Sequence, residues 1–272
     1  LSKDIAIYLL DGLADAKTYR YHTYPLNQLF GAQNQFPSFM ESTHEILTVD
    51  DANNYISRLK AVQKQFSEVL EGLARREDLG ILPPRFVVDK VIDEMQDFIA
   101  TPAQENILYV NLQKKLAETD ASQADQTALL KRSETEIIDA VYPAYSGLIR
   151  YLKSIQDKTT TDDGLWKLPD GAGAYKTALR FFTSTDMTAD EIHNLGLAEV
   201  DRIQSEILEI LAQQSYDVSQ GFSAAVEEMA AKPEFYFEDS KAGREEIIKQ
   251  YQVILDEVDK GLATAFSLRP EK

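Results

Sequence analysis

Residues 48–73 read TVDDANNYISRLKAVQKQFSEVLEGL, and this stretch decides the fold class. Apolar side chains recur in it at every third or fourth residue, which places them on one face of an α-helix. Thr48 can accept a hydrogen bond from a free backbone amide, and Asp51 can complete a capping box at the helix start. Gly80 and the pair Pro83–Pro84 end the segment, so the stretch predicts one long amphipathic helix. Its apolar face consists of Ala52, Tyr55, Leu59, Val62, Phe66, Leu70 and Leu73.

The same helical spacing continues after this segment. Residues 87–99 predict a second helix. Thr101–Pro102 has the pattern of a cap followed by a first-turn proline, which predicts the start of a third helix. Pro143 lies inside a further helical stretch, residues 130–152. Because proline removes a backbone amide and clashes with the preceding turn, we expect a kink or break near Tyr142.

Two later helices have clear start signals. Thr188 and Glu191 predict a second capping box ahead of apolar residues at helical spacing. Ser240 precedes another such series. No alternation of apolar and polar residues is long enough to predict a convincing strand. The sequence therefore predicts an all-α, multi-helix array that forms a single helical domain over residues 1–272.

Two stretches interrupt the helical spacing. Residues 19–39 hold too many aromatic residues and prolines for a regular helix. They could form core or line a binding surface, and we favour core. In residues 162–171, glycines and a proline bracket a short piece that we expect to be extended. We therefore expect at most a small β-hairpin near residues 164–171.

The composition excludes several classes of function. The chain has 272 residues, 44% of them hydrophobic, so it can bury a sizeable core. Its 28 basic and 45 acidic side chains give a formal charge of −17, which repels phosphate backbones, so we expect no nucleic-acid partner. The absence of cysteine excludes disulfides and thiolate metal sites. The apolar run Ile5–Leu10 is much shorter than the roughly 20 residues of a membrane span.

The sequence contains no complete catalytic centre. A helical zinc site needs two histidines one turn apart, with a glutamate between them. Position 48, four residues after His44, is a threonine, and position 197, four residues after His193, is a leucine. The remaining histidine, His22, has no such partner either. Serine-hydrolase and nucleotide-binding motifs are absent. We therefore predict no catalytic residue and no metal ligand in this chain.

Trp166, the one tryptophan, stands in the stretch that is rich in glycine and acidic residues. A large aromatic residue in a loop is often placed there for a contact with a ligand, and Trp166 is therefore a candidate for a binding pocket. The alternative, a purely structural role, stays equally open.

Short motifs are spread over nearly the whole chain. The first half contains Tyr24-Pro25-Leu26-Asn27-Gln28-Leu29, Gly31-Ala32-Gln33, Pro37-Ser38-Phe39, Asp51 with Tyr55, Arg58-Leu59 and Gly80-Ile81-Leu82-Pro83-Pro84. The second half contains Tyr142-Pro143-Ala144-Tyr145, Gly164-Leu165, Leu168-Pro169-Asp170-Gly171 with Tyr175, and Thr188 with Glu191-Ile192-His193, Leu195-Gly196 and Glu199-Val200. Each motif is weak alone. As an ordered set they resemble the bacterial domain-of-unknown-function 885 family.

The resemblance implies a large helical protein related to zinc metallopeptidases of the gluzincin type. In that family the histidine–glutamate zinc motif lies beyond the position of Lys272, so the resemblance implies zinc only for the full-length protein and none for this chain. The expected function is that of a non-catalytic helical half, which lines a channel for a peptide substrate. The alternative is a helical binding or structural module of an exported lipoprotein without enzymatic activity.

The resemblance also implies partners and a location. The expected partner is the missing C-terminal half of the same protein, and helix faces that pack against it would leave an exposed apolar patch here. Several members of the family are exported lipoproteins. A periplasmic or membrane-anchored location, through a lipid anchor that has been removed, is therefore favoured, with the cytoplasm as the alternative.

A substrate-binding hypothesis follows for the stretch around Trp166. An extended protein edge commonly holds a peptide by main-chain hydrogen bonds, and residues 164–171 are the best extended candidate in this sequence. We therefore expect the following residues to border the substrate cleft of the complete protein: Trp166, Asp170, Gly171 and Tyr175.

Overall fold

The computed structural model describes residues 2–268, apart from the side chain of Ala263. Every regular element in this range is helical and none is a strand, so the predicted all-α class is confirmed. The chain divides into two compact units, Leu1–Thr188 and Ala189–Lys272. Each unit has its own helices and is described by itself. The single domain expected over residues 1–272 stays a prediction.

The first unit is built around α3 (Val49–Asp78), the helix expected from residues 48–73. The capping box is confirmed, because the Thr48 hydroxyl accepts a hydrogen bond from the Asp51 amide at 3.2 Å and the Asp51 carboxylate accepts one from the Thr48 amide at 2.9 Å. The six apolar residues of the predicted face other than Leu70 are buried, and Leu70 packs against the same core.

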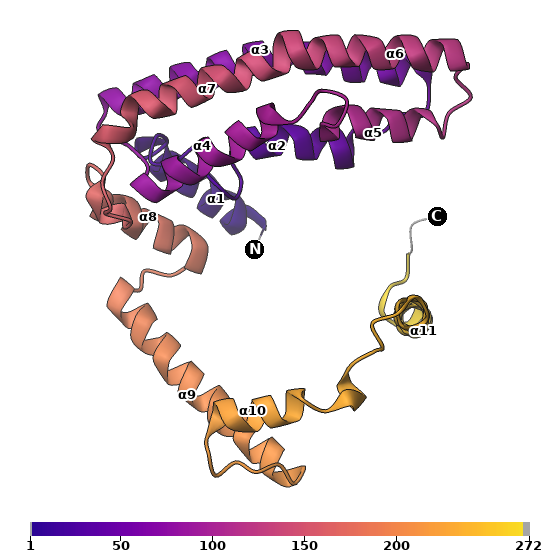
Figure 1. The fold of residues 1–272 in the computed structure, drawn as a ribbon. Helices are drawn as coiled ribbons and strands as arrows, with labels where there is room; N and C mark the ends of the chain where they lie inside the picture. Colours follow the sequence, from indigo (N-terminus) through magenta and orange to yellow (C-terminus); the bar gives the residue numbers. More distant parts are fainter. Residues whose placement is uncertain (1, 269–272) are drawn as a thin grey trace. The chain divides into compact units, whose positions relative to one another are not determined.

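A second long helical run lies along α3 (Figure 1). It consists of α6 (Gln123–Glu136), the π-helix η2 (Ile137–Val141) and α7 (Tyr142–Ile155). The break expected near Tyr142 is absent, because the π-helix passes directly into α7 with helical backbone angles at Val141 and Tyr142. The π-helix is the local irregularity before Pro143, and a kink there stays a prediction.

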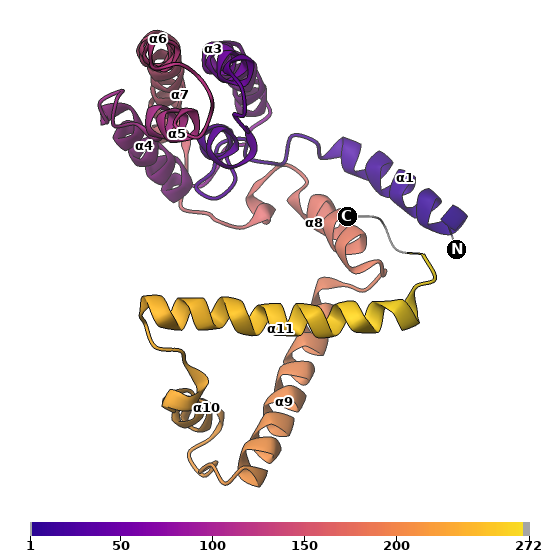
Figure 2. The same cartoon turned by 90° about the vertical axis from the view of Figure 1, so that its right-hand side faces the viewer.

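A second layer lies beneath these helices in both views (Figures 1 and 2). It contains α2 (Ala32–Ser38), the π-helix η1 (Phe39–Thr43), α4 (Arg85–Ala100) and α5 (Ile107–Leu116). The core between the layers includes a group of aromatic rings with centroids 4.6–6.2 Å apart. This group is formed by Phe36, Phe66, Phe98 and Tyr145.

The third helix begins later than the sequence pattern predicts. The prediction at Thr101–Pro102 is wrong, because α5 starts at Ile107 and Asn106 is its cap. The Asn106 side-chain oxygen accepts a hydrogen bond from the Leu108 amide at 3.1 Å, whereas the Thr101 hydroxyl donates backwards to the Asp97 carbonyl at 3.1 Å. Thr101 thus ends the preceding helix and does not cap the next one.

The aromatic stretch 19–39 is only partly irregular. Residues 32–38 form α2, although Pro37 lies inside it, so the expectation that no regular helix occurs here is wrong for this part. Leu26 and Phe36 are buried in the core, as favoured, whereas Phe30 is exposed; a binding role for the stretch stays a prediction.

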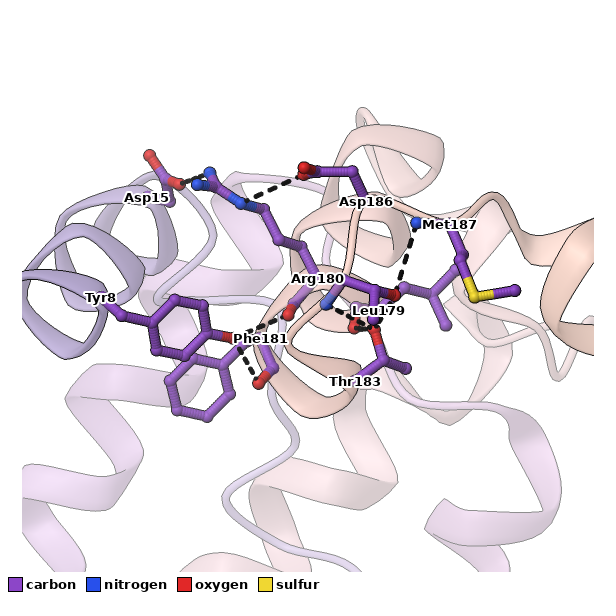
Figure 3. Close-up of polar contacts among 9 residues, drawn as sticks. Tyr8, Asp15, Leu179, Arg180, Phe181, Thr183, Asp186 and Met187 are labelled. Carbon is purple, nitrogen blue, oxygen red and sulfur yellow. Dashed lines mark hydrogen bonds and ion pairs between the residues drawn. The ribbon is translucent and has the colours of Figure 1, made fainter. Parts of the chain in front are cut away.

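The first and last helices of this unit pack against each other. The helix α1 (Ser2–Thr18) lies beside α8 (Gly171–Thr183). The Tyr8 hydroxyl donates to the carbonyls of Arg180 at 2.7 Å and Phe181 at 2.8 Å, at the end of α8 (Figure 3). The Arg180 guanidinium pairs with Asp15 at 3.2 Å. The Arg180 carbonyl also accepts a hydrogen bond from the Ser184 amide at 3.0 Å, so the contact with Tyr8 adds to a helix end that the backbone already caps in part.

The second unit contains α9 (Ala189–Gln213), α10 (Phe222–Ala230), the short 3₁₀ turn η5 (Pro233–Phe235) and α11 (Lys241–Ala265). Ser240 caps α11, as expected, by accepting a hydrogen bond from the Gly243 amide at 3.0 Å. Among the described residues of this unit, only Leu211 and Ala225 are buried apolar side chains. Within residues 2–268, no helix is long and apolar enough to cross a membrane.

Candidate functional site

The stretch 164–171 forms a tight corner before α8. The extended piece expected here is absent, because residues 165–167 form the 3₁₀ turn η4 (Leu165–Lys167). Three successive hydrogen bonds turn the backbone: the Lys167 amide donates to Gly164 at 3.2 Å, the Leu168 amide to Leu165 at 3.0 Å, and the Gly171 amide to Leu168 at 2.9 Å. These bonds between residues three apart oppose an extended strand.

A glycine is required where this corner closes on itself. A Cβ atom on Gly171 would lie 2.1 Å from the Leu165 carbonyl oxygen, so any larger residue would force the backbone apart. Asp170 has a left-handed backbone with φ of 49°, which aspartate tolerates better than most residues. The local sequence therefore dictates a compact turn, which the pattern of glycines and proline alone does not distinguish from an extended piece.

A polar contact attaches this corner to the segment after α1. The Tyr19 hydroxyl donates to the Asp170 carboxylate at 2.7 Å, and this hydrogen bond raises the pKa of Tyr19. The His22 Nε2 atom bonds the Pro169 carbonyl at 2.7 Å, so this nitrogen carries a proton. The rings of Tyr19 and His22 meet edge to face at 5.2 Å. The corner is thus fixed by side chains that lie about 150 residues earlier.

The four predicted site residues divide into two kinds. Asp170 and Gly171 build the corner through the contacts above. Trp166 is 70% exposed and Tyr175 is 49% exposed, so both present aromatic surface to the outside. Their role in binding a substrate stays a prediction.

The described residues offer no site for a metal ion. Within residues 2–268, no three side chains of histidine, cysteine, aspartate or glutamate are grouped so that they could hold one. The residues present therefore do not fit the zinc that the family resemblance implies, and no step of a reaction is derived through it. Zinc elsewhere in the full-length protein stays a prediction.

A second polar feature was not singled out from the sequence. His44, Asp51 and Arg58 meet in a groove between η1 and α3. Three motif residues, Phe39, Asp51 and Arg58, were visible in the sequence, but nothing in their spacing shows that Phe39 comes to lie beside the other two.

The comparisons with known proteins give the family of this chain. A family model described as "Bacterial protein of unknown function (DUF885)" matches residues 1–272. The chain belongs to the DUF885 family. No curated protein matches it.

A solved structure shares the fold of this DUF885 chain. It is a crystal structure described as that of "the putative lipoprotein from Colwellia psychrerythraea", with a TM-score of 0.83 and 24% sequence identity. The match covers 91% of this chain and 42% of the other. The DUF885 chain therefore spans less than half the length of the protein that it resembles.

Proposed function

We propose that this DUF885 chain is a non-catalytic helical part of a zinc-metallopeptidase-like protein, and that it lines a channel for a peptide substrate. The observation that carries the proposal is a pair of exposed aromatic rings: Trp166 at a corner that is otherwise closely held, and Tyr175 in the helix α8 that follows it. Family membership and the greater length of the structural neighbour support the view that other residues of a longer protein supply the chemistry.

The corner suits a contact with peptide because its backbone is fixed while its rings are free. Tryptophan and tyrosine offer a large apolar surface together with one hydrogen-bonding group, a combination that suits both side chains and main chain of a peptide. Residues held by surrounding hydrogen bonds lose little conformational freedom when a ligand binds. Since the backbone here is turned and not extended, the proposed contact uses the side chains of Trp166 and Tyr175 and not strand pairing.

Peptide hydrolysis by the full-length protein tests this proposal. We expect Trp166→Ala and Tyr175→Ala each to lower kcat/KM about tenfold, because each removes an aromatic contact worth roughly 1–2 kcal/mol. Tyr236→Ala is the matched control, since Tyr236 is 64% exposed and lies in the second unit. Unchanged kcat/KM in both variants would remove the channel hypothesis.

The metal content of the same full-length protein separates two classes of function. Stoichiometric zinc together with peptide cleavage supports the metallopeptidase-like protein. Neither zinc nor cleavage would support the alternative, a helical binding or structural module of an exported lipoprotein.

We propose that the full-length protein is exported and anchored by a lipid. The structural neighbour is described as "the putative lipoprotein", and the family resemblance implies exported lipoproteins as well. Metabolic labelling of the full-length protein with a fatty acid, followed by separation of membranes, checks this. Unlabelled protein in the cytoplasm would contradict it.

We propose that the remaining part of the same protein is the partner of this chain. The support lies in α11, where an apolar face runs along the helix at helical spacing and is exposed in the second unit. Its most exposed members are Ile248, Tyr251, Ile254, Leu255 and Val258, which are 53–70% exposed.

A further inference from the structure

A groove lies between α3 on one side and α2 with η1 on the other. Its volume is about 370 Å³, which is within the usual range of pockets for small ligands. Phe36, Met40 and Val62 form its buried floor. Phe39 and Ala61 give it an exposed apolar surface, and the exposed side chains of Gln65 and Arg58 provide polar groups. The groove therefore combines an apolar surface with groups that can hydrogen bond.

The Arg58 guanidinium is held by contacts on two sides. One of its amino groups donates to the Nδ1 atom of His44. Its central carbon lies 5.2 Å from the ring centroid of Phe39, which is a cation–π distance. Phe39 is 41% exposed, and it lies in the π-helix η1, a kind of turn that is frequent at functional sites. Arginine has five N–H donors, so donors remain for a ligand after the bond to His44.

His44 can accept this hydrogen bond because it is neutral. Its Nε2 atom donates to the Asp51 carbonyl at 3.1 Å, which leaves Nδ1 as the acceptor. Burial, together with the charges of Arg58 and Lys115, lowers the pKa of His44. Lys115 also fixes the end of η1 by donating to the carbonyls of Glu41 at 2.7 Å and His44 at 2.6 Å. Contacts with His44 and Phe39 therefore hold the Arg58 side chain in place.

The ionisable residues that line the groove indicate which kind of ligand it favours. Arg58 is the one ionisable residue among those that line the 370 Å³ groove. Glu45 and Asp51 line only the adjoining, more open region. The planar fork of a guanidinium matches a carboxylate, with two parallel hydrogen bonds. A carboxylate is thus favoured beside Arg58, and an apolar group is favoured against the exposed apolar surface of Phe39 and Ala61.

We propose that this groove binds the carboxyl-terminal residue of a peptide, with its carboxylate on Arg58 and its apolar side chain against Phe39 and Ala61. Gln65 lines the same groove, and its amide can hydrogen bond to the preceding peptide group. The proposal does not depend on the channel at Trp166, because the groove lies on other elements and contains none of the four residues discussed there.

Calorimetric titration of the 272-residue chain with N-acetyl-phenylalanine tests the proposal. We expect the free acid to bind, and N-acetyl-phenylalanine amide to bind at least about tenfold more weakly, because a charge-assisted hydrogen bond is lost. Acetate alone should also bind at least about tenfold more weakly, since it has no apolar side chain. Equal affinity for acid and amide, or for acid and acetate, would overturn the proposal.

Two variants, Arg58→Gln and Gln65→Glu, test whether the ligand binds in this groove. Arg58→Gln should weaken binding of N-acetyl-phenylalanine about tenfold or more. Lys60→Gln is the matched control, since Lys60 is exposed on the same helix two residues away and does not line the groove. Gln65→Glu places a carboxylate at the edge of the groove without touching the contacts of Arg58 with His44, and should also weaken binding by charge repulsion. Unchanged affinity in either Arg58→Gln or Gln65→Glu would overturn the proposal.

Discussion

The Tyr145 hydroxyl donates a hydrogen bond of 2.6 Å to the carbonyl of Gln33, and both residues are buried. Gln33 lies four residues before Pro37, inside the same helix α2. A residue at position 37 would normally donate its amide to this carbonyl, but proline has no amide hydrogen. Tyr145 therefore supplies the donor that Pro37 lacks. The same burial raises the pKa of Tyr145, so its hydroxyl stays protonated as a donor.

Tyr145→Phe should lower the free energy of unfolding by about 1–3 kcal/mol, because it leaves a buried carbonyl without a donor. Urea unfolding followed by circular dichroism measures this. Tyr251→Phe is the control, since Tyr251 is 65% exposed and a surface change of this kind stays within about 0.5 kcal/mol. If Pro37→Ala is introduced first, the new amide at position 37 can donate to the carbonyl of Gln33. Tyr145→Phe should then lower the free energy of unfolding by less. An equal loss of unfolding free energy with and without Pro37→Ala would show that Tyr145 does not replace the missing amide.

Thr48→Ala should lower the free energy of unfolding by about 1 kcal/mol, because α3 loses the side chain that caps its start. Chemical unfolding at neutral pH measures the change. Thr127→Ala provides a control of the same chemistry, since the Thr127 hydroxyl is exposed in the middle of α6 and donates to the carbonyl of Gln123. A loss no larger than that of Thr127→Ala would show that the cap contributes nothing.

Asp51 gives the cap a dependence on pH. Hydrogen bonds from the Thr48 hydroxyl and from the backbone amides of Leu47 and Thr48 lower its pKa in the folded state. A depressed pKa contributes stability that is present above the ordinary pKa of aspartate, about 4, and is lost as the pH falls through the folded value. Asp51→Asn should therefore reduce the difference in unfolding midpoint between pH 7 and pH 3. Asp50→Asn, at the neighbouring position, is the matched control, because these hydrogen bonds go to the Asp51 carboxylate.

Tyr8→Phe should loosen the contact between α1 and α8, because the hydroxyl that donates to the carbonyls of Arg180 and Phe181 is lost. Hydrogen exchange with mass spectrometry should show faster exchange in residues 2–18, while α3 stays protected. Tyr236→Phe serves as the comparison, since the Tyr236 ring is exposed in the second unit. Protection of residues 2–18 equal to that of the unchanged chain would refute the role given to Tyr8.

The apolar face of α11 should cause this chain to self-associate when its partner is absent. Replacing Leu255 and Val258 by Gln should reduce the mass measured by light scattering. Val253→Gln is a control on the same helix, because at 100° per residue Val253 points away from that face although it is 52% exposed. If light scattering shows that the unchanged chain is a monomer, this result counts against a missing partner.

Local patterns predicted the helices because the interactions that form a helix join residues close in sequence. The caps at Thr48 and Ser240 depend on partners within four residues, so the sequence alone determines them. The same is true of the periodic apolar face of α3, which the structure buries almost completely.

Only the tertiary structure decided the features that depend on distant partners. Pro37 lies inside a helix, and the carbonyl of Gln33 that it leaves without an amide donor is satisfied by Tyr145, which lies 112 residues after Gln33. Residues 164–171 form a corner tied by Tyr19, 151 residues before Asp170. The groove at Arg58 exists because folding brings the ring of Phe39 to 5.2 Å from the guanidinium carbon of Arg58, which lies 19 residues later. Such contacts carry no periodic signal, since their free energy comes from groups that meet only after the chain has folded.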